Sequence, residues 1–281
     1  MKLTRRKFIA RTTLTIAGPT LLAQLEAAKR AQVRVGSCMI GLPEAKEAGL
    51  DGVEVRVSRK PEDRLEISEP AVRAKLKEQM RQTGLPVVSL MMGILNQAPL
   101  ASDPRGPAWL EQSIDAAHDL GAKVILVAFF GKGDLLDADG KVKQQDVDVV
   151  VQRLRDAAPR AGKAGVILAI ENTLPATENM RILDRVGHNS VQCYYDVYNT
   201  GVTKGYDVPA EIRLLKNRIV QVHFKNGPQY LDERKQFFEA AVAALNEIGY
   251  NGWIILETSS PSKNPVADAR RNADFLRRLF A

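Results

Sequence analysis

Residues 166–196 read VILAIENTLPATENMRILDRVGHNSVQCYYD, and this stretch decides the fold. It holds two short apolar runs, at 166–171 and 191–196, on either side of an amphipathic helical pattern at 177–187. A run, a helix and a second run in this order are typical of two parallel strands joined by a crossover helix. The stretch therefore predicts a parallel sheet covered by helices.

The same unit recurs along the chain. Strand-like runs are expected at 33–38, 52–57, 86–91, 123–129, 166–171, 191–196, 219–223 and 253–257. Helical patterns are expected at 43–49, 69–83, 107–120, 145–163, 177–187, 207–216, 232–248 and 264–280. Strands that are each followed by a helix, without a linker or a dinucleotide-binding glycine motif after the first strand, favour a closed barrel over an open doubly wound sheet. We predict an α/β fold, a single-domain (β/α)₈ TIM barrel over residues 28–281.

The N-terminal segment, residues 1–27, differs from the rest in composition. Arg5 and Arg6 precede a mildly apolar stretch, which resembles a twin-arginine export signal. The stretch is too short and too polar to be a stable membrane anchor. We expect a signal peptide that engages the twin-arginine export machinery, is removed, and leaves the remaining chain in the periplasm. The alternative is a frayed basic helix.

Charge and cysteine content narrow the function further. The N-terminal segment carries five basic residues against Glu26, which is +4 of the formal net charge of +7. The remaining charge is small and of mixed sign, so we expect no nucleic-acid partner. Cys38 and Cys193 lie far apart without zinc-ligand spacing, which is typical of small buried residues. The oligomeric state stays open, with a homo-oligomer as one alternative.

Four consecutive strand-like runs end on side chains that can bind a metal: Glu171, Asp196, His223 and Glu257. The carboxyl ends of barrel strands meet at one mouth, so these side chains are expected to converge. Taken singly, each has a structural alternative, such as a helix cap, an ion pair or a core histidine. Together they predict an oxygen-rich site for one divalent metal ion, with Mn²⁺ favoured and Mg²⁺, Co²⁺ or Zn²⁺ as alternatives.

Such a site predicts a proton-transfer reaction. A cation that bridges a carbonyl and a neighbouring hydroxyl acidifies the C–H bond between them. A carboxylate beside that carbon can then move the proton. Glu171 and Glu257 are the expected catalytic acid and base, acting on a small-molecule sugar or sugar derivative through a metal-stabilised enediolate.

The chain resembles the sugar phosphate isomerase/epimerase branch of the xylose isomerase-like barrels. The resemblance rests on LAIEN (168–172), YYDVYNTG (194–201), VQVHFKN (220–226) and FFEAAVAALNEIGYNGWIILETS (237–259). It implies a metal held by the residues that end strands five to eight, here Glu171, Asp196, His223 and Glu257, with the two glutamates as opposed acid and base. It also implies that Lys225 lies beside the site.

Two departures from the ketose 3-epimerases of this branch concern the substrate pocket. Asn199 stands where those enzymes have a substrate-contacting histidine, and the segment GPQY (227–230) lacks their arginine. Glu54 and Arg56 alternate toward the barrel interior in the second strand and are expected to contact substrate, with a buried ion pair between them as the alternative. The expected substrate-binding residues are therefore Glu54, Arg56, Asn199 and Lys225.

The sequence thus predicts a divalent-metal-dependent sugar isomerase or epimerase. One alternative is a metal-dependent lyase, dehydratase or hydrolase acting on a keto-sugar. Another, from outside the enzymes, is an exported carbohydrate-binding barrel.

Overall fold

The computed structural model describes residues 33–281. The expected export signal at 1–27 lies outside the described residues. Among the described helices, none has the length and apolar character needed to cross a membrane.

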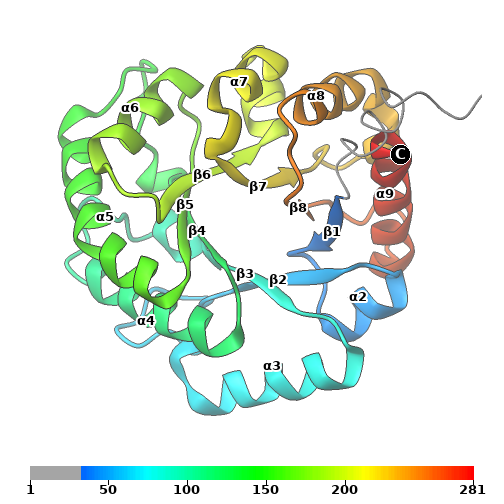
Figure 1. The fold of residues 1–281 in the computed structure, drawn as a ribbon, viewed down its shortest axis with the longest axis horizontal. Helices are drawn as coiled ribbons and strands as arrows, with labels where there is room; N and C mark the ends of the chain where they lie inside the picture. The colour runs from blue at the N-terminus through cyan, green and yellow to red at the C-terminus, as the bar shows by residue number, and fades with distance from the viewer. Residues whose placement is uncertain (1–32) are drawn as a thin grey trace, which may run out of the picture.

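Eight parallel strands close into a barrel in the order of the chain, as predicted (Figure 1). The strands are β1 (Arg34–Ser37), β2 (Gly52–Arg56), β3 (Val87–Met92), β4 (Val124–Ala128), β5 (Ile167–Glu171), β6 (Val191–Asp196), β7 (Ile219–Phe224) and β8 (Trp253–Leu256). Most of the expected strands differ from the observed ones by one residue at an end, because a strand ends where its pairing ends.

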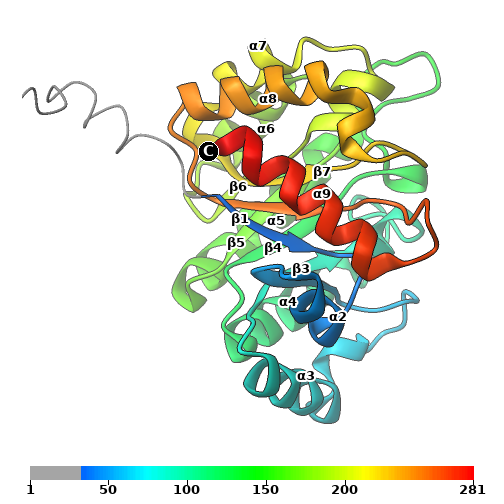
Figure 2. The ribbon, with the colours of Figure 1, turned by 90° about the vertical axis from the view of Figure 1, so that its right-hand side faces the viewer.

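A ring of α-helices covers the outside of the barrel (Figures 1 and 2). The helices are α2 (Leu42–Ala48), α3 (Pro70–Thr83), α4 (Gly106–Leu120), α5 (Gln144–Ala164), α6 (Ala176–Val186), α7 (Val208–Leu215), α8 (Lys235–Glu247) and α9 (Pro265–Phe280). The expected helix at 232–248 begins as a separate 3₁₀ turn, Leu231–Arg234. Each expected helix is otherwise present, so the (β/α)₈ prediction is confirmed.

Strand alternation divides the core into two layers. Val222, Ile254 and Leu256 belong to the outer layer between the strands and the helices. Leu126 and Ile255 belong to a smaller cluster inside the barrel. Neighbouring residues of a strand point to opposite sides of the sheet. This alternation therefore determines which side chains at the carboxyl end of each strand face the barrel mouth.

The two ends of the described chain close the barrel against each other. β1 pairs in parallel with β8, with Arg34 opposite Trp253 and Ser37 opposite Leu256. At Gly36 an added Cβ would lie 2.9 Å from both the Gly52 carbonyl oxygen and the Ile255 side chain, so only glycine permits this close packing. β1 is thereby locked between β2 and β8, beside the strand end that carries Glu257.

Candidate functional site

The structure brings Glu171, Asp196, His223 and Glu257 to one place at the carboxyl end of the barrel. Glu171 and Asp196 are the last residues of β5 and β6, His223 is the penultimate residue of β7, and Glu257 directly follows β8. One nitrogen or oxygen atom from each residue lies within 4.8 Å of those of the other three. The side chain of His223 is 0% exposed, whereas that of Glu257 is 31% exposed and faces the mouth.

Two basic side chains lie among these carboxylates. His223 Nδ1 is 3.1 Å from Glu171 Oε1, 3.6 Å from Glu257 Oε2 and 3.9 Å from Asp196 Oδ2. Lys225, two residues further along the chain from His223, donates a hydrogen bond of 2.6 Å to Glu257 Oε2. Its Nζ also lies 2.9 Å from Asp196 Oδ2. The centre therefore holds closely spaced opposite charges beneath a small opening.

The two glutamates of the centre have pKa values that are pushed apart. Burial raises the pKa of Glu171 to about 7, against the smaller lowering effect of His223. Burial also acts to raise the pKa of Glu257, but the nearby His223 and Lys225 outweigh it and lower the pKa below its usual range. The buried centre thus pairs one carboxyl group whose pKa is raised with another whose pKa is lowered.

A cavity of about 220 Å³ opens directly onto these residues. Its polar lining comes from Asn96, Glu171, Asn199, Lys225 and Glu257, and its apolar lining comes from Met91, Gly93, Leu126, Ala128 and Phe130. The wall thus combines charged and polar groups with apolar side chains. This mixture suits a small ligand that has both hydroxyl groups and a hydrocarbon face.

The four residues expected to bind substrate lie in different places. Asn199 and Lys225 line the cavity. Asn199 belongs to a π-helical turn, Asn199–Thr203, and its backbone N–H donates to Asp196 Oδ1 at 2.6 Å. Arg56 is exposed at the end of β2 and lies near enough to Glu257 to lower its pKa.

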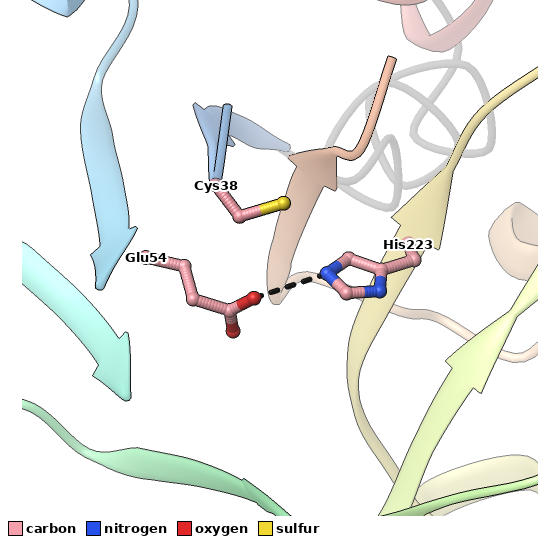
Figure 3. Close-up of side chains that lie close together, drawn as sticks. All are labelled: Cys38, Glu54 and His223. Carbon is pink, nitrogen blue, oxygen red and sulfur yellow. Dashed lines mark hydrogen bonds and ion pairs between the residues drawn. The ribbon is translucent and has the colours of Figure 1, made fainter. Parts of the chain in front are cut away.

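Glu54 lies below the cavity, with a side chain that is 0% exposed. Within the described part of the chain it forms no ion pair with Arg56. It contacts His223 instead: Glu54 Oε1 is 3.1 Å from His223 Nε2, and Cys38 lies beside the pair (Figure 3). Burial raises the pKa of the Cys38 thiol to about 11, so the thiol is protonated at neutral pH.

The sequence did not predict the contacts of Glu54 with the polar side chains inside the barrel. Ser89, Tyr194 and Gln221 join Glu54 and His223 in one buried hydrogen-bonded network. Strand alternation placed Tyr194 and Gln221 on the inward face with Asp196 and His223. Strand alternation could therefore have suggested that these side chains meet. The partners come from separate strands, however, and the sequence does not show how those strands are staggered relative to one another.

The donor set fits a divalent cation. Three carboxylates and one imidazole converge, and Asp196 Oδ2 is buried without a hydrogen-bond donor in proper geometry among the described residues, although Lys225 Nζ lies nearby. A buried carboxylate oxygen is unfavourable unless a cation compensates it, as Lys225 does in part here. Glu171, Asp196, His223 and Glu257 could each supply one ligand atom to such a cation.

Comparison with known proteins supports a family assignment. Over residues 42–279 the chain matches the model of the xylose isomerase-like TIM barrel family. A 2-epi-5-epi-valiolone 7-phosphate 2-epimerase from Actinoplanes sp. is 26% identical over 209 residues, which are 68% of this chain and 74% of that protein.

Two solved structures have the same fold. One is a D-allulose 3-epimerase from Methylomonas sp., with a TM-score of 0.70 and 17% identity over 88% of this chain and 97% of that chain. The other is the 3-keto-D-glucoside 4-epimerase YcjR from E. coli, also with a TM-score of 0.70 and 17% identity, over 88% of this chain and 100% of that chain. With the family match, which spans most of the described barrel, these findings show that the chain belongs to the xylose isomerase-like TIM barrel family.

Proposed function

We propose that this chain is a divalent-metal-dependent epimerase or isomerase of a sugar or sugar derivative. The observation that carries the proposal is the convergence of three carboxylates and one imidazole at the carboxyl end of the barrel, where a cavity opens onto Glu171 and Glu257. Family membership and similarity to sugar epimerases support the same reaction class.

Glu171, Asp196, His223 and Glu257 are the proposed metal ligands. A divalent cation bound there, with Mn²⁺ favoured, would polarise a substrate carbonyl and an adjacent hydroxyl and thereby acidify the C–H bond between them. The proposed ligand atoms are mostly oxygen atoms, which Mn²⁺ and Mg²⁺ prefer. A structural zinc site, in contrast, is typically rich in thiolates.

Glu171 and Glu257 are the proposed acid and base. They come from β5 and β8, which lie on different sides of the barrel mouth (Figure 1). A carboxylate on one side of a substrate carbon can remove its proton while a carboxyl group on the other side returns one, and this inverts the configuration.

The cavity indicates a small substrate. Its volume of about 220 Å³ is below the roughly 300–1,000 Å³ usual for drug-sized ligands, and a single sugar unit suits it. Lys225 and Asn199 are proposed to bind substrate oxygens, and exposed Arg56 is placed to bind a group that projects from the mouth. Met91, Leu126 and Phe130 offer an apolar wall for the C–H face of the ring.

Hydrogen exchange tests the proposal. The chain loaded with Mn²⁺ is incubated in D₂O with a panel of ketoses, keto-glycosides and their phosphates, and each product is analysed by NMR and mass spectrometry. We expect deuterium at the carbon beside the carbonyl together with an epimeric or isomeric product. The Glu257→Gln variant should lose at least about 100-fold in rate while it keeps its fold.

The outcomes separate the alternatives. A product that has lost the mass of water would identify a dehydratase, and saturable binding without exchange would identify a carbohydrate-binding barrel. Activity in Glu257→Gln at the wild-type rate would remove Glu257 from the chemistry.

We also propose that the chain is exported to the periplasm by the twin-arginine route. The support is the sequence around Arg5 and Arg6 alone. Cell fractionation of the wild type and of a variant with Arg5→Lys and Arg6→Lys tests this, because loss of the arginine pair should retain the protein in the cytoplasm.

A further inference from the structure

Beneath the cavity, His223 lies between two carboxylates. Its Nδ1 is 3.1 Å from Glu171 Oε1, on the side of the proposed metal site. Its Nε2 is 3.1 Å from Glu54 Oε1, and Figure 3 shows this second contact. Both the His223 and Glu54 side chains are 0% exposed, so water does not compete for these contacts. Each ring nitrogen therefore has its own acidic partner.

The hydrogen bonds around Glu54 run in one direction. Gln221 Nε2, which can only donate, lies 2.6 Å from Ser89 Oγ and 3.1 Å from Tyr194 OH. Each hydroxyl accepts from Gln221 and has one hydrogen left to donate. Glu54 Oε2 lies 2.7 Å from Ser89 Oγ and 3.1 Å from Tyr194 OH, and so it accepts both hydrogens. Glu54 is thereby held as an acceptor, and its Oε1 faces His223.

From this geometry we propose that Glu54 is a positioning residue that keeps a proton on His223 Nε2, so that Nδ1 presents its lone pair to the metal. The inference rests on the proposed metal site. In metal centres, a histidine ligand that gives its other N–H to a carboxylate is fixed in tautomer and orientation and is a stronger ligand. The hydroxyls of Ser89 and Tyr194 hold the carboxylate at the height that this contact needs.

The same residues also have the spacing of a second metal site. One atom each of Cys38, Glu54 and His223 lies within 4.8 Å of the others, a spacing that suits a metal ion. A metal there would have to displace the proton on His223 Nε2 and compete with both hydroxyl donors of Glu54. The formed hydrogen bonds favour the positioning role, and a second ion becomes an outcome of the test.

Calorimetric Mn²⁺ titration of the full chain tests the inference. The wild type should bind one ion, and His223→Ala should bind none. Glu54→Gln preserves the shape of the side chain but removes its charge, and we expect the affinity to fall about 10- to 100-fold with the stoichiometry unchanged. Cys38→Ala is the matched control beside the same ring and should bind as the wild type does.

The tautomer is measured separately by ¹⁵N NMR with diamagnetic Mg²⁺. The chain has three histidines, His118, His188 and His223, so the ring signals can be assigned by substitution. The Mg²⁺-bound wild type should carry its His223 proton on Nε2, and Glu54→Gln should shift this proton toward a mixture of both nitrogens. Tyr194→Phe, which removes one donor to Glu54 and keeps its charge, provides a milder variant in case Glu54→Gln does not fold, with an expected loss of affinity of a few-fold.

Each contrary outcome points to a different part of the proposal. Unchanged affinity and an unchanged His223 tautomer in Glu54→Gln, with Mn²⁺ binding intact in the wild type, would overturn the positioning role alone. Two ions bound by the wild type and one by Cys38→Ala would overturn it in favour of a second metal site. Absence of binding in the wild type would overturn the metal site and this inference together.

Discussion

The cavities at the two ends of the barrel differ both in volume and in the residues that line them. The amino end has the larger hollow, about 620 Å³, lined by basic and apolar residues such as Arg34, Lys123 and Trp253. The carboxyl end has a hollow of about 220 Å³ above Glu171 and Glu257. Among the described residues that line the larger hollow there is no Asp, Glu or His. The larger cavity is therefore not the one that adjoins the candidate functional site.

The two ends also differ in the exposure of their charged side chains. At the amino end the basic side chains of Arg34 and Lys123 are exposed, so water solvates them at little cost. At the carboxyl end Glu54, Glu171, Asp196 and His223 are all less than 5% exposed. Burial of an ionised group costs several kcal/mol, roughly, unless partners compensate it. A fold that keeps four such groups together does so for chemistry rather than for stability.

The largest expected effect tests this contrast with one substitution at each end. Glu171→Gln should lower the rate of hydrogen exchange in substrate by about 10²- to 10⁴-fold, because it removes a proposed proton carrier that is also a carboxylate of the proposed metal site. Lys123→Gln, at the amino end, should leave the rate within about two-fold, because exposed surface substitutions rarely perturb the fold. Steady-state rates of the two variants with saturating Mn²⁺ measure this. Equal losses in both variants would break the comparison.

The fold was predictable because every βα unit carries its own signal. The apolar runs of β4 and β6 and the helical periods of α5 and α9 are local, and closure of the barrel follows from their number and order. The four proposed ligands were also visible in the sequence, since each lies within one residue of the end of its strand. These features depend on neighbours in the chain.

The role of Glu54 could not be predicted in the same way. Alternation correctly directed Glu54 inward, but its depth relative to His223 depends on the stagger between β2 and β7. The register between β2 and β3 shifts at Val53 and Glu54, which local patterns do not reveal. A one-layer difference in depth separates a residue that touches substrate from one that supports a metal ligand.

The next effect is the pH dependence of Mn²⁺ binding at the carboxyl end of the barrel. In the metal-free protein the pKa of Glu171 is raised to about 7 and that of His223 is raised well above its usual value. Below pH 7 protons therefore compete with the metal, and Mn²⁺ affinity should rise with pH by at least about ten-fold per unit from pH 5 to pH 7. Calorimetry in buffers of different ionisation enthalpy should also detect proton release. An affinity that is constant over this range would mean that neither Glu171 nor His223 gives up a proton when Mn²⁺ binds.

A smaller effect tests the loops that support the carboxyl end. Asp268 in α9 accepts hydrogen bonds from Tyr230, from Ser260, and from both the hydroxyl and the backbone N–H of Ser262. Burial acts to raise its pKa, but these donors outweigh it and lower the pKa. Asp268→Asn should lower the free energy of unfolding by about 1–3 kcal/mol, since some donors would face an amide NH₂.

The sign of the pH dependence follows from that lowered pKa. The stabilisation by Asp268 is fully present above its pKa in the unfolded chain, about 3.9, and is lost as the pH falls through the lower pKa of the folded state. Urea unfolding of Asp268→Asn and wild type at pH 7 and below pH 4 measures both effects. Asp274→Asn, an exposed position in the same helix, is the control and should change stability by less than about 0.5 kcal/mol.

The smallest effect is expected at the amino end. The Arg34 guanidinium lies 4.6 Å from the centre of the Trp253 ring, where β1 closes against β8. An exposed cation–π contact of this kind contributes about 0.5–1 kcal/mol, so Arg34→Ala should destabilise the fold by no more than that. Exchange activity and Mn²⁺ affinity should both be unchanged, because the contact lies at the far end of the strands from Glu257. A loss of Mn²⁺ affinity without a loss of stability would show that the amino end does more than close the barrel.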